Sequence, residues 1–90
     1  MPHIVIYTTA ACPYCIAAKR LLGQKGAKYE EIKVDGDGAG RARMTELSKG
    51  CRTVPQIFID GRHIGGCDDL YELERQGRLD PLLSGNGAAA

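Results

Sequence analysis

Two cysteines separated by two residues are the feature of this sequence with the clearest chemistry. Cys12 and Cys15 flank Pro13 and Tyr14, and proline suits the first position of a helix because its missing N–H would stay unpaired there. A sulfur just ahead of a helix lies near free backbone N–H groups and the positive end of the helix dipole, which both stabilise a thiolate. We therefore predict that Cys12 is the exposed nucleophile of a thiol–disulfide exchange. Cys15 is then the resolving thiol, which attacks the mixed disulfide.

The same spacing also fits half of a structural zinc site, which would need two more ligands at comparable spacing. Cys51 and Cys67 are far apart in the sequence, and His3 and His63 fall in or beside expected strands. A position between a strand and a helix is instead typical of a redox-active pair in a thioredoxin-like context. The sequence therefore favours redox chemistry for Cys12 and predicts no bound metal.

The first half of the chain must place this pair, and its pattern predicts two strand–helix units. Their expected order is a buried strand at 4–7, a helix from Pro13 to a stop at Gly26, a strand at 29–34, a break at 36–38 and a helix over 39–49 that Gly50 ends. The residues expected on the inner faces of the two helices are Cys15, Ala18, Leu22, Met44 and Leu47.

The second half predicts a hairpin and a third helix. Asp60-Gly61 joins strands expected at 56–59 and 62–64, and this dipeptide is a strong hairpin signal. Asp68 and Asp69 open a helix, because carboxylates favour the positive end of its dipole. That helix is expected to bury Leu70 and Leu73, to end near Gly77 and to be followed by an apolar turn at 79–83. One domain over 1–83 results, with a disordered tail over 84–90.

Composition narrows the possible partners. The 90 residues contain 12 basic and 11 acidic side chains, so the near balance of charge argues against binding to nucleic acid or to an anionic membrane. No apolar stretch approaches the roughly 20 residues of a membrane span, and the first residues lack a basic leader with a cleavage site. We expect a monomer in the reducing cytoplasm, where a close cysteine pair is more often catalytic than structural.

Three segments together resemble the dithiol glutaredoxins of bacteria. They are Cys12-Pro13-Tyr14-Cys15, Thr53-Val54-Pro55-Gln56 and Gly65-Gly66-Cys67-Asp68-Asp69-Leu70, and they follow the family's order and spacing within a resemblance that runs from Ile4 to Leu83. The resemblance implies an α/β thioredoxin fold, with a four-stranded mixed sheet flanked by three or more helices in the order β-α-β-α-β-β-α. It also implies a glutathione site, with these expected contacts: Tyr14, Arg52, Thr53, Val54, Pro55, Gly66, Cys67, Asp68 and Asp69.

The Val54–Pro55 bond is cis in the proteins that this chain resembles, although only about 5% of X–Pro bonds are cis in general. The resemblance implies that Val54 offers its N–H and C=O to the cysteinyl part of glutathione, which pairs like an added strand. Without the resemblance, Pro55 would be interpreted simply as the start of a strand.

Asp68 and Asp69 fit two roles. By themselves they are typical helix caps, whereas the resemblance implies that one of them receives the ammonium group of glutathione. Gly65 and Gly66 allow close approach of a ligand, and the helix N-terminus after them can bind a carboxylate. We expect Cys67 to be a small, buried or half-buried residue that lines the groove and has no catalytic role.

Two positions depart from the family pattern. Many relatives carry a lysine shortly before the nucleophile, where this chain has Thr9 and no nearby cation. We expect a less stabilised thiolate and a weaker hold on a glutathione carboxylate, unless Arg52 or Lys19 substitutes. Cys51 is the second oddity, and an inert side chain is favoured over a thiol open to glutathionylation.

The implied activity is that of a glutathione-disulfide oxidoreductase with no tightly bound cofactor and with glutathione as co-substrate. Its implied partners are disulfide-containing or glutathionylated proteins, ribonucleotide reductase among them, and indirectly glutathione reductase with NADPH. Three alternatives remain open. They are a glutathione-assisted iron–sulfur module, a glutaredoxin-like carrier reduced by thioredoxin reductase, and a redox-inert interaction domain.

Overall fold

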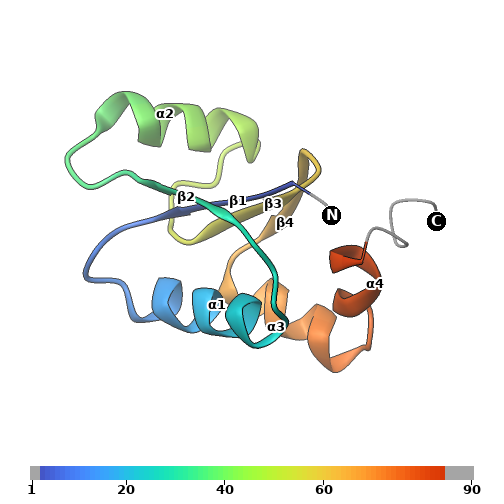
Figure 1. Ribbon diagram of the computed structural model, residues 1–90. Helices are drawn as coiled ribbons and strands as arrows, with labels where there is room; N and C mark the ends of the chain where they lie inside the picture. The colour runs from blue at the N-terminus through green and yellow to red at the C-terminus, as the bar shows by residue number, and fades with distance from the viewer. Residues whose placement is uncertain (1–2, 85–90) are drawn as a thin grey trace.

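A four-stranded sheet with helices on both faces forms the protein in the computed structural model, which describes residues 3–84 (Figure 1). The elements are β1 (Ile4–Thr8), α1 (Pro13–Gln24), β2 (Glu30–Lys33), α2 (Gly38–Leu47), β3 (Gln56–Ile59), β4 (Arg62–Gly65), α3 (Cys67–Arg75) and α4 (Leu79–Leu83). The strand order is β2-β1-β3-β4, with β1 parallel to β2 and antiparallel to β3, and β3 antiparallel to β4. The predicted element order is confirmed, and the last apolar turn is the short helix α4.

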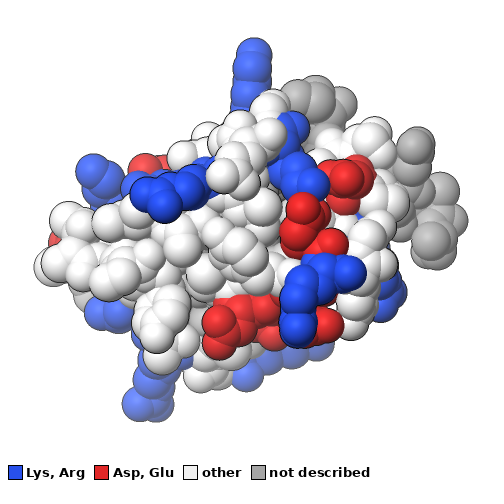
Figure 2. All heavy atoms as spheres, turned by 90° about the horizontal axis from the view of Figure 1, so that it is seen from below, with Lys and Arg blue, Asp and Glu red and all other residues white. Residues whose placement is uncertain are grey.

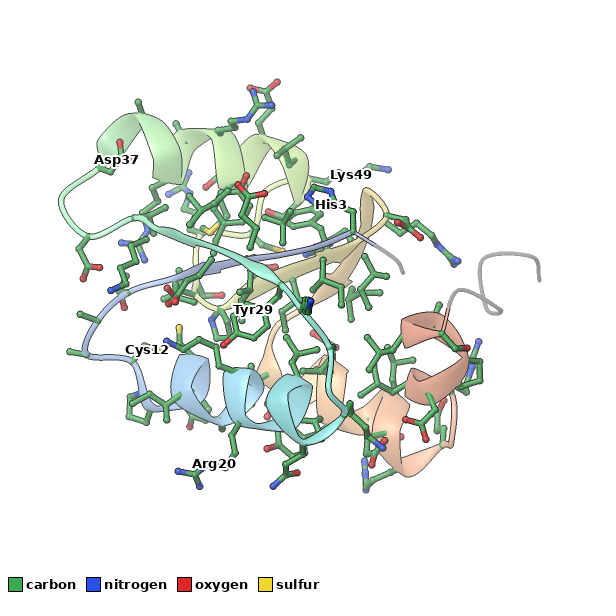
Figure 3. The ribbon with its side chains drawn as sticks, in the orientation of Figure 1. His3, Cys12, Arg20, Tyr29, Asp37 and Lys49 are labelled. Carbon is green, nitrogen blue, oxygen red and sulfur yellow. The ribbon has the colours of Figure 1, made fainter. Side chains whose placement is uncertain are left out.

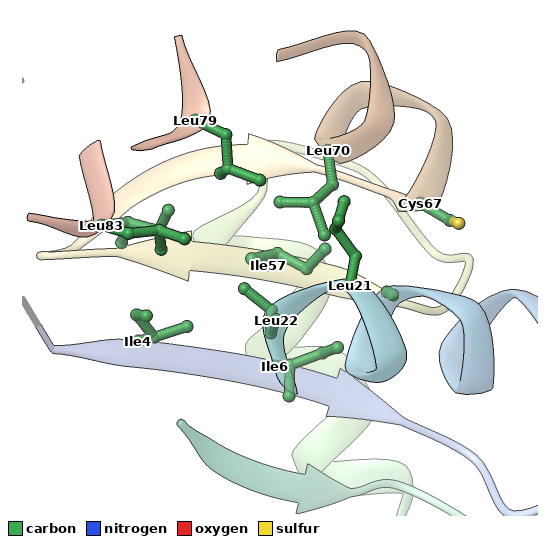
Figure 4. Close-up of a cluster of buried hydrophobic side chains, with 11 residues drawn as sticks. Ile4, Ile6, Leu21, Leu22, Ile57, Cys67, Leu70, Leu79 and Leu83 are labelled. Atoms are coloured by element: carbon green, nitrogen blue, oxygen red, sulfur yellow. The ribbon is translucent and has the colours of Figure 1, made fainter. Parts of the chain in front are cut away.

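Alternate residues of the central strands face opposite layers, as the period of a strand requires. Ile4 and Ile6 pack toward α1, α3 and α4, whereas Tyr7 packs with Val34 and Met44 on the side that α2 covers (Figure 1). Figure 4 shows the larger cluster, in which leucines of the helices meet isoleucines of β1 and β3. The core therefore fixes α1 firmly against the sheet, and α1 carries the cysteine pair.

The local signals for turns are confirmed at the positions where the backbone needs them. Asp60 and Gly61 have φ angles of 52° and 79°, which is the left-handed pair that a tight hairpin between β3 and β4 requires. Helix α1 ends at Gln24, and Gly26 follows with a φ of 69°, a conformation that glycine adopts without steric cost.

One predicted core residue is wrong. Leu47 was expected to face inward with Met44, but its side chain is 45% exposed while Met44 is fully buried. Ser48, four residues after Met44, takes the buried position, and its hydroxyl contacts the carbonyls of Thr45 and Cys51. Helix α2 thus ends at Leu47, two residues earlier than expected, because Ser48 caps it and ties the following loop.

A half-buried ion pair connects α1 to the sheet. The ammonium group of Lys19 lies 2.9 Å from Glu31 Oε2 on β2, and the same oxygen accepts a 2.6 Å hydrogen bond from Thr8 Oγ1 at the end of β1. The two charged side chains are only 28% and 24% exposed. Three elements therefore meet at one carboxylate, close to the loop that carries Cys12.

None of the helices within residues 3–84 is long and apolar enough to cross a membrane. The expected tail over 84–90 falls almost entirely outside the described residues, which end at Ser84.

Replacing the buried methionine of α2 should cost far more stability than replacing its exposed neighbour. We expect Met44→Ala to lower the free energy of unfolding by about 2–5 kcal/mol, because it leaves a cavity in the core. Leu47→Ala should change it by no more than about 0.5 kcal/mol. Urea unfolding of both variants measures this difference, and equal losses would contradict the orientation of α2.

Removing the charge of Glu31 should destabilise the protein near neutral pH but not in acid. Its hydrogen bond from Thr8, together with that from Lys19, lowers the pKa of Glu31 below the ordinary 4.5. A lowered folded-state pKa contributes stability above pH 4.5 that is lost as the pH falls through the lowered value. We expect Glu31→Gln to cost about 1 kcal/mol at neutral pH, with the difference from the native protein vanishing on acidification.

The matched control for this titration is Glu30→Gln, which removes an exposed carboxylate whose one ion-pair partner among residues 3–84 is His3. Its unfolding free energy should stay close to the native value over the same range. A deficit in Glu31→Gln that stayed constant through the acid range would show that the Glu31 charge is not what stabilises the fold.

Candidate functional site

Cys12 stands at the start of α1 as the helix N-cap. Its backbone is extended, Pro13 follows as the first helical residue, and Cys12 Sγ accepts a hydrogen bond from the N–H of Cys15 at 3.2 Å. This N–H is one of the donors that a helix leaves unpaired at its N-terminus. Figure 3 shows Cys12 at this first turn. Cys12 therefore lies at the helix start as predicted, although it is half-buried rather than fully exposed; its role as the nucleophile stays a prediction.

Cys15 occupies a very different environment one turn into the same helix. Its side chain is fully buried, and burial raises the pKa of Cys15 to about 12, with further upward contributions from the hydrogen bond to Cys12 and from the Cys12 charge. The backbone of Thr9 and the charge of Lys19 act in the opposite direction on this pKa. Cys15 is therefore held as a neutral thiol beside a sulfur that is placed to be an anion.

The bond between Val54 and Pro55 is cis, as the resemblance implied, and it lies in the loop that leads into β3. The carbonyl oxygen of Val54 lies 3.7 Å from Cys12 Sγ, within the reach of a weak S–H···O contact. Among residues 3–84, the N–H of Val54 has no hydrogen-bond partner. The main chain beside Cys12 thus offers a free donor at its outer side.

A groove of about 440 Å³ runs between this loop and the start of α3. That volume lies within the usual range for small-molecule sites. The groove brings together most of the predicted glutathione contacts, namely Tyr14, Thr53, Val54, Pro55, Gly66, Cys67, Asp68 and Asp69. It is also lined by Gly65, which the sequence predicted to allow close approach of a ligand, and by two residues that were not among the predicted contacts: Cys51 and Gln56. The segments that resemble the glutaredoxin motifs therefore converge in space.

Gln56 was missed although it lies within a quoted motif, whereas Gly65 was expected to allow close approach of a ligand. Gln56 is buried, and its amide nitrogen donates to the carbonyl oxygen of Thr53 at 3.0 Å, which braces the loop before the cis proline. Gly65 has a φ of 120°, and a Cβ at this position would lie 2.3 Å from a carboxylate oxygen of Asp69. Both residues therefore shape the groove through the backbone that they hold.

The sequence left open which of Asp68 and Asp69 caps the helix and which is available to a ligand. Asp69 Oδ2 accepts a 2.9 Å hydrogen bond from the N–H of Gly66, so Asp69 caps α3. Within the described part of the chain, Asp68 forms no hydrogen bond or ion pair, and its exposed carboxylate faces the groove. Asp68 is therefore the one that is free to meet a positively charged ligand group.

Cys67 lies where the sequence predicted it, buried and at the wall of the groove. Figure 4 shows its sulfur turned away from the leucine cluster. Burial raises the pKa of Cys67, and the charges of Asp68 and Cys12 raise it further. Its thiol is thereby kept neutral, which agrees with a non-catalytic wall position.

Of two further predicted contacts, Tyr14 lines the groove and Arg52 does not. Tyr14 is 63% exposed at the mouth of the groove. Arg52 does not line the groove, because it belongs to a separate hollow with residues of α2, Arg41 and Thr45 among them. Lys19 is held by Glu31. Neither of the two cations that the sequence offered in place of the missing lysine is therefore a free charge within the groove.

This groove is not the largest hollow, but it is lined by Val54, whose carbonyl oxygen lies beside Cys12 Sγ. A larger hollow of about 700 Å³ lies between β4, α3 and α4, but no cysteine lines it. In Figure 2, which shows the molecule from below, acidic and basic side chains alternate over the α3 and α4 end. They include ion pairs of Lys25 with Glu74 and Asp80, and of Arg75 with Glu72. The redox groups lie at the opposite end of α1.

Known proteins of similar sequence and structure agree with this arrangement. The family model for glutaredoxin matches residues 4–64. The chain is 55% identical over 83 residues to Glutaredoxin 3 of Escherichia coli strain K12, which covers 92% of this chain and 99% of the relative. It is 57% identical over 84 residues to a glutaredoxin of Pseudomonas aeruginosa, covering 93% and 99%.

Solved structures give the same result. A buckwheat glutaredoxin in complex with glutathione superposes with a TM-score of 0.84 and 42% identity, covering 99% of this chain and 83% of that one. A glutaredoxin from Brucella melitensis has a TM-score of 0.80 and 52% identity, with coverage of 92% and 89%. The expected thioredoxin fold is thereby confirmed, and this chain belongs to the glutaredoxin family.

Proposed function

We propose that this glutaredoxin reduces glutathione mixed disulfides and protein disulfides through Cys12 and Cys15, with glutathione as its co-substrate. The observation that carries the proposal is the contrast between the two sulfurs. Cys12 Sγ accepts a helix N-terminal N–H at 3.2 Å beside a groove, while Cys15 is buried with a pKa near 12. One sulfur is thus placed to attack, and the other is protected until it is needed.

Glutathione would lie along the groove with its cysteinyl sulfur at Cys12. The unpaired N–H of Val54 supports main-chain pairing with the cysteinyl residue, as in the addition of a short strand. Asp68, whose carboxylate is free and lines the groove, would receive the ammonium group of the γ-glutamyl residue. The complex of the similar buckwheat protein supports glutathione as the ligand.

The proposed reaction begins when the Cys12 thiolate attacks a glutathionylated substrate. A bond forms between Cys12 and the glutathione sulfur, the substrate thiol leaves, and a second glutathione restores Cys12 with release of glutathione disulfide. With a protein disulfide, Cys15 attacks the mixed disulfide on Cys12 instead and frees the reduced protein. Two glutathione molecules then reduce the Cys12–Cys15 disulfide.

The cellular setting follows from this chemistry as part of the proposal. A glutathione-reduced cysteine pair works in a reducing compartment such as the cytoplasm. The partners we propose are disulfide-containing and glutathionylated proteins, with glutathione reductase and NADPH regenerating the glutathione. Ribonucleotide reductase belongs to this class of substrate.

Serine variants of the two cysteines separate the two halves of the mechanism. We expect Cys12→Ser to abolish glutathione-coupled reduction of a glutathionylated peptide, because no other sulfur stands at the helix N-cap. Cys15→Ser should keep substantial deglutathionylation but lose reduction of a protein disulfide. Consumption of NADPH in the presence of glutathione reductase measures both reactions. Native activity in Cys12→Ser would show that the proposed mechanism is wrong.

Asp68→Asn should weaken glutathione use without weakening the fold. We expect the KM for glutathione to rise by roughly tenfold, since one charge-assisted contact is lost, while the thermal midpoint stays near the native value. Asp69→Asn is the matched control, since its carboxylate is used by Gly66. It should lower stability by no more than about 1 kcal/mol, through the lost charge near the N-terminus of α3. An unchanged KM in Asp68→Asn would remove Asp68 from the binding site.

A further inference from the structure

The resolving step requires a deprotonated Cys15, and no group in the groove explains how the Cys15 thiolate is stabilised. Cys15 is fully buried, yet it must lose its proton before it can attack the sulfur of Cys12. Burial opposes that loss because it disfavours a charged group. A favourable charge near Cys15 would therefore accelerate resolution without affecting the first attack by Cys12.

We propose that Lys19, held by Glu31 and Thr8, is a positioning residue that stabilises the Cys15 thiolate when Cys15 resolves a mixed disulfide on Cys12. The proposal rests on the proposed function, in which Cys15 is the resolving thiol. It goes beyond that function by assigning a role to three residues outside the groove.

The helix spacing brings the cation to Cys15. Lys19 follows Cys15 by four residues on α1, and residues four apart lie on the same face of a helix, one turn from each other. Cys15 packs on the buried side of α1, and the side chain of Lys19 is itself only 28% exposed. An exposed lysine would extend into water, where its charge is screened, but this one turns toward the sheet.

Glu31 and Thr8 fix that direction. The Lys19 ammonium group lies 2.9 Å from Glu31 Oε2, and this oxygen also accepts the 2.6 Å hydrogen bond from Thr8 Oγ1. Thr8 is fully buried at the end of β1, immediately before the loop that leads to Cys12. Because Glu31 and Thr8 already hold the Lys19 ammonium group in place, its charge is positioned before the reaction and needs no reorganisation during it.

Lys19 acts as a fixed charge and not as a proton acceptor. Its hydrogen bond to Glu31 raises the pKa of Lys19 above 10.5, and the charges of Glu31, Tyr29 and Cys15 raise it further against a smaller effect of burial. Lys19 therefore stays protonated while Cys15 ionises. Figure 3 shows Tyr29 between α1 and the sheet.

The other groups around Cys15 explain when Lys19 matters. In the reduced protein, the Cys12 thiolate raises the pKa of Cys15 through a hydrogen bond and through its charge. Both effects end when Cys12 enters a mixed disulfide, because its sulfur is then uncharged. Burial remains, opposed by the backbone of Thr9 and the charge of Lys19. The favourable charge is thus least opposed at the step that needs it.

Charged and titratable groups also face this network from the neighbouring elements. Beyond Glu31, β2 carries Lys33, whose charge lowers the pKa of Glu31. On the α3 side, the charge of Cys12 raises the pKa of Cys67. The phenol of Tyr71 donates to the carbonyl oxygen of Ala17 at 3.1 Å. Lys19 is the one positive side chain that is found to act on Cys15 among the described residues.

The chemical step balances without an outside oxidant. Cys15 loses its proton to solvent and its sulfur attacks Cys12, so that a bond forms between the two sulfurs. The bond between Cys12 and the substrate sulfur breaks, and that sulfur leaves as a thiolate that takes up a proton. The cysteine pair is oxidised by two electrons, and the substrate disulfide is reduced by the same two.

A coloured nitrobenzoate disulfide, supplied in less than one equivalent, times both steps in one experiment. The reduced protein should release one nitrothiolate when Cys12 attacks, and a second in a slower unimolecular phase when Cys15 resolves. We expect Lys19→Met to slow the second phase roughly three- to tenfold near neutral pH and to leave the first phase unchanged. All proteins compared, including the reference with native Lys19, carry Cys51→Ser, so that this thiol does not contribute.

The pH dependence of the second phase separates an electrostatic role from a structural one. We expect its midpoint to move to higher pH in Lys19→Met and to return toward the native value in Lys19→Arg, which restores the charge. Glu31→Gln, which loosens the tether, should give an intermediate midpoint. Lys25→Met is the matched control, because Lys25 is ion-paired with Glu74 and Asp80 at the far end of α1, and both phases should match the native protein.

Two outcomes overturn the proposal. One is a second phase in Lys19→Met with native rate and native midpoint. The other is a slow second phase with an unshifted midpoint that Lys19→Arg does not restore. Failure of the proposed function has a different signature, in which the native protein shows no second phase or Cys12→Ser keeps the first.

Discussion

The hydrogen bond from the N–H of Cys15 to the sulfur of Cys12 is the interaction on which the rest of the site depends. It exists because Cys12 is the N-cap of α1, where a helix leaves its first donors unpaired. In most helices a serine, threonine or aspartate oxygen takes this position, whereas here a reactive sulfur takes it. The cap of the helix and the proposed nucleophile are therefore one atom, so the core that holds α1 against the sheet also holds Cys12 in place.

The same helix gives two identical side chains opposite properties. Cys12 is half-buried and accepts a backbone donor, while Cys15 is fully buried with a pKa near 12. One helical turn is enough to separate them, because the first turn ends at the surface and the second packs on the sheet. Burial thereby keeps Cys15, the sulfur that the proposed function assigns to resolution, as a neutral thiol. The ion pair of Lys19 with Glu31 lies outside the groove, and in our proposal its positive charge stabilises the thiolate of Cys15.

The groove has a different origin from the cysteine pair. Its walls come from the loop before β3 and from the start of α3, which meet only because β3 and β4 are adjacent in the sheet. Asp68 and Asp69 have different roles there. Asp69 caps the helix, and among the described residues the carboxylate of Asp68 has no partner. The absence of a lysine near Thr9 is not compensated by Arg52, which lies in another hollow. In the proposed function, recognition of glutathione therefore relies on the main chain of Val54 and on Asp68 more than on a cationic contact.

The sequence by itself determined the elements, the turn at Asp60-Gly61 and the redox pair, because these depend on spacing and on local backbone preferences. It also identified most of the groove, through three motifs that each keep a fixed order. Tertiary structure decided what local pattern leaves open. Leu47 and Ser48 both lie within one turn of Met44, and only packing and the hydroxyl's hydrogen bonds choose the serine for the interior. Asp68 and Asp69 are equal in sequence, and only the position of Gly66 selects the cap. Lys19 and Glu31 are 12 residues apart, and the pairing of β1 with β2 beneath α1 brings them together, because long-range contacts are set by the fold and not by neighbouring residues.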